Sequence, residues 1–151
     1  MRELRAVALV MLLGSAYGGA SAQGDAARGA YLAKAAGCVG CHTEAKESAT
    51  PYAGGRALKT PFGTFYGPNI TPHPSAGLGR WSEADFVRAM RLGLRPDGEH
   101  YFPAFPYPSF TRITDADLRD LWAYLRTLPP SARRYAHRSR RSASVMRVND
   151  G

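Results

Sequence analysis

The feature that most constrains this chain is the segment Cys38-Val39-Gly40-Cys41-His42. It contains both cysteines of the sequence, three positions apart, and a histidine directly after the second one. A disulfide between them would close a very small loop and so would restrain little of the unfolded chain. A thioredoxin-type pair would need a βαβ context, which is missing. A zinc site needs four ligands, and the other three histidines are scattered without ligand spacing.

The same spacing is the attachment signature for haem c. Two thiols at this distance can add to the two vinyl groups on one edge of a porphyrin, and the next residue then reaches the iron. We therefore predict one covalent haem c. Cys38 and Cys41 are its predicted attachment points, and His42 is the predicted proximal iron ligand.

Both ends of the chain differ in composition from its middle. Residues 1–22 begin with Arg2 and Arg5, continue as an uncharged apolar run and end in small residues, which is typical of a signal peptide. The apolar run is too short to cross a bilayer, which needs about 20 residues. We predict a periplasmic, exported protein with a cleaved signal, the alternative being an uncleaved N-terminal anchor.

The net charge of +8 comes mostly from the ends. Residues 131–151 hold six arginines against one aspartate and are predicted to be a basic, disordered tail. Residues 23–130 hold 12 basic and 10 acidic side chains, so the predicted domain itself is nearly neutral. Nucleic acid is not an expected partner for an exported protein, and any membrane association is expected to be peripheral.

Residues 23–130 are predicted to form one all-α domain with about three main helices. Asp25, Ser82 and Thr114 are the expected N-caps, and glycine or proline follows each helix. No strand is predicted. The predicted helices, caps included, cover residues 25–36, 82–92 and 114–128.

The segments between these helices, 43–80 and 94–113, lack periodicity and are rich in proline, glycine and aromatic residues. A loop of that length in a compact domain is expected to wrap something. So little helix would leave a thin core, which a large, flat, apolar cofactor would complete. The aromatic candidates for the wall around the haem, each of which could equally belong to the ordinary core, are Phe62, Phe65, Trp81, Phe102 and Tyr107.

This order of helix, Cys-x-x-Cys-His, loop, helix, aromatic loop and terminal helix resembles the cytochrome c fold. Residues 67–70 are similar to a Gly-Pro-Asn-Leu segment of that family, whose proline carbonyl accepts the second N–H of the proximal histidine. The resemblance implies that Pro68 orients His42. The terminal helix around Trp122 resembles the one that crosses the first helix at a small residue, here Gly29.

Further segments are similar to the cytochrome c subunits of membrane-bound alcohol, aldehyde and gluconate dehydrogenases. The similarity covers Gly24 to Pro130. It implies an electron carrier rather than an enzyme, with redox proteins as partners. Electrons would pass from a quinoprotein or flavoprotein dehydrogenase to the respiratory chain. The segments are residues 60–64, 67–72, 81–86 and 101–107.

The sequence departs from these relatives at the sixth iron ligand. Many of them have a methionine where this chain has Phe105, which cannot bind iron. His100 is the nearest replacement in the sequence, whereas Met90 is expected to belong to the core. An open sixth position, with Arg95 near His100, would favour the alternative function of a haem-based small-ligand binder or a peroxidase-like enzyme. The remaining ligand candidates are His73, His137 and Met146.

Overall fold

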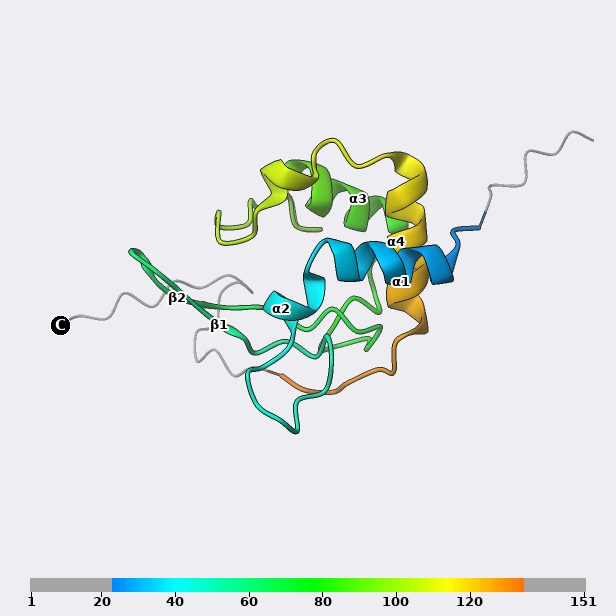
Figure 1. Ribbon diagram of the computed structural model, residues 1–151. Helices are drawn as coiled ribbons and strands as arrows, with labels where there is room; N and C mark the ends of the chain where they lie inside the picture. The colour runs from blue at the N-terminus through cyan, green and yellow to red at the C-terminus, as the bar shows by residue number, and fades with distance from the viewer. Residues whose placement is uncertain (1–22, 135–151) are drawn as a thin grey trace, which may run out of the picture.

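Four helices and one short hairpin follow one another in the part of the chain that this computed structural model describes, residues 23–134 (Figure 1). The predicted signal peptide and residues 135–151 of the predicted tail lie outside it. The elements are α1 (Ala26–Ala35), α2 (Cys38–His42), β1 (Ala57–Thr60), β2 (Gly63–Tyr66), α3 (Glu83–Leu92), the 3₁₀ turn η1 (Tyr107–Phe110) and α4 (Asp115–Thr127).

The three long helices begin at the predicted caps. The Asp25 carboxylate accepts the N–H of Ala27 at 2.8 Å. Ser82 and Asp85 form a reciprocal capping box, with Ser82 Oγ accepting the Asp85 N–H at 3.1 Å. The hydroxyl of Thr114 likewise accepts a backbone N–H of the first turn of α4, at 3.1 Å. The helix predictions are therefore confirmed to within a residue or two.

Helices α1 and α4 cross each other at Gly29 (Figure 1). A Cβ on Gly29 would lie 1.9 Å from the carbonyl oxygen of Asp120, so only glycine allows the two backbones this approach. Arg28 joins the same crossing through ion pairs with Asp117 and, at 2.7 Å, with Asp120. The predicted crossing at Gly29 is confirmed.

The predicted absence of strands is wrong, so the all-α class is only approximately right. Strands β1 and β2 pair antiparallel, from Ala57 opposite Tyr66 to Thr60 opposite Gly63. The Thr60 hydroxyl holds the turn: it donates to the Gly63 carbonyl at 2.9 Å and accepts the Phe62 N–H at 3.1 Å. Figure 1 shows this hairpin projecting from the helical part of the domain.

The buried core lies where α1, α3 and α4 meet. Leu118 on α4 is fully buried, and Phe86 and Met90 face it from α3. None of the helices between residues 23 and 134 is both long enough and apolar enough to cross a bilayer. The buried cluster consists of Ala33, Leu78, Phe86, Met90, Leu118, Leu121 and Leu125.

After α4 the chain returns to the loop that follows β2. The Asn69 side-chain amide donates to the carbonyls of Ser131 and Arg133, at 2.8 and 3.1 Å. The N–H of Ser131 donates to the hydroxyl of Thr71 at 3.1 Å. Because Asn69 and Thr71 are buried, the first residues of the predicted tail satisfy polar groups of the domain.

Candidate functional site

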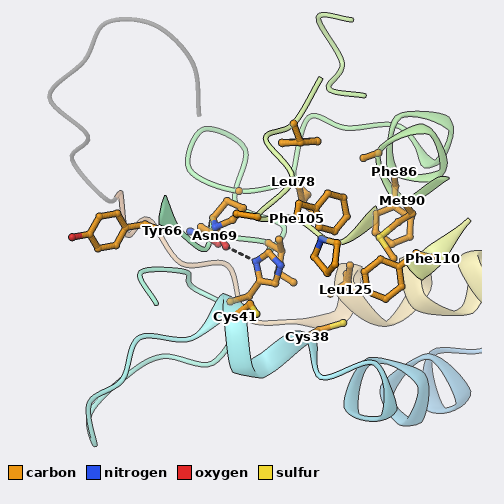
Figure 2. A pocket seen from close by; sticks show the side chains of 18 of the residues that line it. Cys38, Cys41, Tyr66, Asn69, Leu78, Phe86, Met90, Phe105, Phe110 and Leu125 are labelled. Carbon is orange, nitrogen blue, oxygen red and sulfur yellow. Dashed lines mark hydrogen bonds between the residues drawn. The ribbon is translucent and has the colours of Figure 1, made fainter. Parts of the chain in front are cut away.

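An apolar cavity of about 430 Å³ lies between α2, the loops on either side of α3, and the inner faces of α3 and α4 (Figure 2). This volume lies within the usual range for ligand pockets, about 300–1,000 Å³. Most of its wall is aliphatic or aromatic, for example Leu78, Phe86 and Leu125. The long loops predicted to wrap a cofactor do surround this space.

Helix α2 brings the three predicted site residues to one rim of the cavity. Gly37, with φ of +69°, reverses the chain after α1, so that Cys38 to His42 form a separate helical turn. Cys38, Cys41 and His42 all line the cavity. Burial raises the pKa of the Cys38 thiol.

The His42 ring is held by one hydrogen bond. Its Nδ1–H donates to the carbonyl of Pro68 at 2.8 Å, drawn as the dashed line in Figure 2. Burial lowers the pKa of the imidazole, although the Pro68 carbonyl acts in the opposite direction. Because Nδ1–H is engaged by Pro68, Nε2 is the nitrogen left to bind a metal. The predicted contact between Pro68 and His42 is confirmed.

The backbone around Gly67 fixes the position of the Pro68 carbonyl. A Cβ on Gly67 would lie 1.7 Å from the carbonyl oxygen of Cys41, so the loop rests directly on α2. The Gly67 carbonyl accepts the N–H of Gly55 at 2.8 Å, and Ile70 N–H donates to the carbonyl of Tyr52 at 2.9 Å. The Gly-Pro pair was the signal for this arrangement, but the role of residues 52–55 was missed because it depends on contacts between loops.

Three of the five aromatic residues expected in the wall do line the cavity. Phe65 and Phe102 stack on each other with ring centres 4.2 Å apart, and Trp81 lines the cavity from the loop before α3. Phe62 and Tyr107 do not line it. Phe62 is at the hairpin turn with 61% of its surface exposed, and Tyr107 packs beside Gly93.

Neither His100, the predicted replacement ligand, nor His73, a further candidate, lines the cavity. His73 Nδ1 accepts the N–H of Ala76 at 3.1 Å, within a turn of its own loop. His100 is exposed and pairs through its backbone with Leu94. Arg95 forms an ion pair with Glu99 at 2.8 Å and does not line the cavity. The arginine and histidine of the alternative function are therefore not part of this site.

Of the other residues considered for the sixth ligand position, two line the cavity and two lie outside the described part of the chain. Phe105 lines the cavity, and its ring packs on Phe110 with centres 5.9 Å apart. Met90 belongs to the core, as expected, and also lines the cavity, which the sequence pattern did not indicate. His137 and Met146 lie outside the described residues.

The donor set fits a porphyrin bound through sulfur. The two cysteine side chains and the His42 imidazole share one rim, and most of the remaining wall is apolar, as the faces of a porphyrin require. Fold and site thus define a helical domain built around a planar cofactor.

The protein belongs to the cytochrome c family, whose family model matches residues 26–129. Covalently bound haem c is the cofactor of this family.

The chain is also similar to parts of longer curated proteins. It is 53% identical over 103 residues to a nicotinate dehydrogenase subunit of Pseudomonas putida, covering 68% of this chain and 8% of that protein. It is 43% identical over 121 residues to the cytochrome c subunit of the quinone-dependent alcohol dehydrogenase of Gluconobacter oxydans, covering 78% of this chain and 25% of the subunit.

A third relative is the gluconate 2-dehydrogenase cytochrome c subunit of Pantoea cypripedii. It is 44% identical over 97 residues, covering 64% of this chain and 22% of the subunit. The chain thus spans about a quarter or less of these three relatives. The resemblance to cytochrome c subunits of dehydrogenases is confirmed.

Proposed function

We propose that this chain is a mono-haem cytochrome c domain that transfers electrons, with haem c attached through Cys38 and Cys41 and with His42 as the proximal iron ligand. The observation that carries the proposal is the 2.8 Å hydrogen bond from His42 Nδ1 to the Pro68 carbonyl. It fixes the tautomer and the orientation of a ring whose other nitrogen is then available to the iron. The thiols of Cys38 and Cys41 lie on the same helical turn.

The haem would supply a reversible one-electron change at its iron. The protein's own residues orient and tune that centre. The Pro68 carbonyl makes the His42 imidazole more basic, which favours the ferric state, while the apolar wall excludes water and favours the less charged ferrous state. Leu78, Phe86 and Leu125 belong to that wall.

The relatives suggest where the electrons come from. Two of the three are named as cytochrome c subunits of dehydrogenases, and the third as a dehydrogenase subunit. We propose that this domain accepts electrons from a quinoprotein or flavoprotein dehydrogenase and passes them to the respiratory chain, without transforming a substrate itself. The proposed location is the periplasm, because residues 1–22 have the composition of a signal peptide.

The attachment can be tested by expressing the full chain in a bacterium with a haem c maturation system. The denatured protein is expected to keep a mass increase of one haem and to have no free thiol. Cys38→Ala and Cys41→Ala should each leave one thioether, and the double variant should carry no covalent haem. Ser75→Ala, at another point of the cavity wall, is the matched control and should keep the full mass. A wild-type chain without added mass and with two free or mutually bonded cysteines would contradict the proposal.

A further inference from the structure

Only one methionine is present in the part of the chain that the structure describes, and it lines the cavity. Met90 lies on α3 and is 8% exposed. Figure 2 shows its side chain at the wall remote from Cys38 and Cys41, on the far side of the cavity from α2. Its thioether is therefore in the same cavity as His42 but on a different wall.

The position of Met90 is set by the helix that carries it. Ser82 and Asp85 fix the start of α3 through the capping box, and Gly93 ends it with φ of +64°. Phe86 and Met90 are four residues apart, so both project from the same face into the core and the cavity. A methionine side chain is unbranched, and its three rotatable bonds let the sulfur adapt its position within such a wall.

Few other side chains in the wall could act as a second axial ligand. Haem iron in proteins is held by histidine, methionine, cysteine or tyrosine. Within residues 23–134, His73 and His100 do not line the cavity, and Cys38 and Cys41 are the attachment points of the proposed function. The remaining described candidates are therefore two tyrosines and Met90.

The tyrosines are poor ligands for different reasons. Tyr66 is 44% exposed, and Figure 2 shows its hydroxyl directed away from the cavity. Burial raises the pKa of Tyr101 to about 12, so its phenol stays protonated at neutral pH. Phe105 stands at the position of the methionine in the resembled subunits. Its ring packs against Tyr101 and Phe110, and it has no atom that can bind iron.

We propose that the Sδ atom of Met90 is the second axial ligand of the iron, completing a His42–Met90 pair. The inference rests on the proposed function, because it requires haem attached at α2. It moves the sulfur ligand from the aromatic loop around Phe105 to helix α3.

The test uses the matured holoprotein with [methyl-¹³C]methionine. In the ferrous protein, an iron-bound methionine gives a methyl resonance shifted strongly upfield by the haem ring current. In the ferric protein, it gives a sulfur-to-iron charge-transfer band in the red. Both signatures are expected in the wild type, and neither experiment depends on the folding of a variant.

Variants then assign the sulfur. Met90→Leu, close to Met90 in volume, should abolish both signatures and lower the reduction potential. A double variant, Met11→Leu with Met146→Leu, removes two of the three methionines outside the described residues, the third being the initiator Met1, and should keep both signatures.

The outcomes separate this inference from the proposed function. Absence of covalent haem would overturn the proposed function. Covalent haem without either methionine signature would overturn only the Met90 assignment, as would signatures that survive in Met90→Leu or disappear in the double variant. Both signatures in the wild type and the double variant, lost in a folded Met90→Leu, would support the assignment.

Discussion

At the scale of single residues, Gly29 shows most directly how one side chain decides the packing of the domain. Helix α4 passes so close that a Cβ at this position would also lie 2.8 Å from the Cβ of Tyr124. The nearest atoms belong to the backbone around Asp120, which cannot move aside without shifting α4. A methyl group here must therefore separate the two helices.

We expect Gly29→Ala to lower the free energy of unfolding by about 1–3 kcal/mol, the usual cost of overpacking a well-packed contact. Urea denaturation of the holoprotein measures this. Tyr31→Ala on the same helix is the control, because that side chain is 70% exposed, and it should change stability by at most about 0.5 kcal/mol. Equal losses in the two variants would show that the crossing tolerates a side chain.

The residue scale also shows what sequence patterns reveal about a site. The short spacing of Cys38, Cys41 and His42 was enough to predict that they meet at one rim. Met90 was assigned only to the core, since a helical apolar face looks the same whether it packs on protein or on a cavity. Met90 is buried in the core and also lines the cavity, and only the tertiary structure shows that the cavity is there.

At the scale of elements, the α1–α4 crossing is held by a carboxylate as well as by close packing. The Asp120 carboxylate accepts a hydrogen bond from Arg28 and, at 2.7 Å, the N–H of Asp25. The bond from Arg28 is the first cause that lowers the pKa of Asp120, and the bond from Asp25 is the second. The two helices are thus joined through a charged group near the start of α1.

We expect Asp120 to make stability depend on pH in the acid range. Its pKa is lower in the folded chain than the unfolded value of about 3.9, so the unfolded state binds more protons between these two values. Its contribution is therefore complete above the unfolded pKa and is lost as pH falls through the folded pKa. Urea midpoints measured from about pH 6 down to about pH 2.5 should show Asp120→Asn less stable at the upper end and the two curves converging in acid.

The control for this series is Asp97→Asn. Asp97 pairs with Arg95 in a loop and is 52% exposed, so its loss should leave the acid slope nearly unchanged. If Asp120→Asn unfolds in acid with the wild-type slope, the carboxylate does not link the crossing to pH.

The elements also differ in how far the sequence predicted them. The three long helices were predicted because their caps are local signals within four residues, as at Ser82 and Asp85. The hairpin was missed because β1 and β2 have only four residues each, and only β1 alternates regularly, between exposed and half-buried positions. A usable signal existed in residues 60–63, where proline in the second position and glycine in the fourth are typical of a tight turn.

At the scale of the whole molecule, the side of the cavity that carries His42 depends on distant parts of the chain. The loop that carries Pro68 rests on α2 through Gly67 and is joined to the segment after α4 through Asn69. Asn69 also accepts the N–H and the hydroxyl of Thr71, at 2.9 and 2.7 Å. Residues 131–133 thus complete a buried polar network behind the loop that orients His42, and a basic composition alone could not predict this role.

A pair of shortened chains tests that network. A chain ending after Pro130 removes both acceptors of the Asn69 amide and the donor to Thr71, whereas one ending after Arg134 keeps them. Leaving buried polar groups without partners costs about 1–3 kcal/mol. The chain ending at Pro130 should therefore unfold at a lower urea concentration than the one ending at Arg134.

The control is Arg133→Ala, which removes a 2.7 Å ion pair with Glu44 but keeps the backbone carbonyl, and it should have little effect on the urea midpoint. Equal midpoints for the two shortened chains would mean that water satisfies Asn69 and Thr71 as well as the segment does, and that the loop around Pro68 is held by Gly67 and its backbone contacts alone.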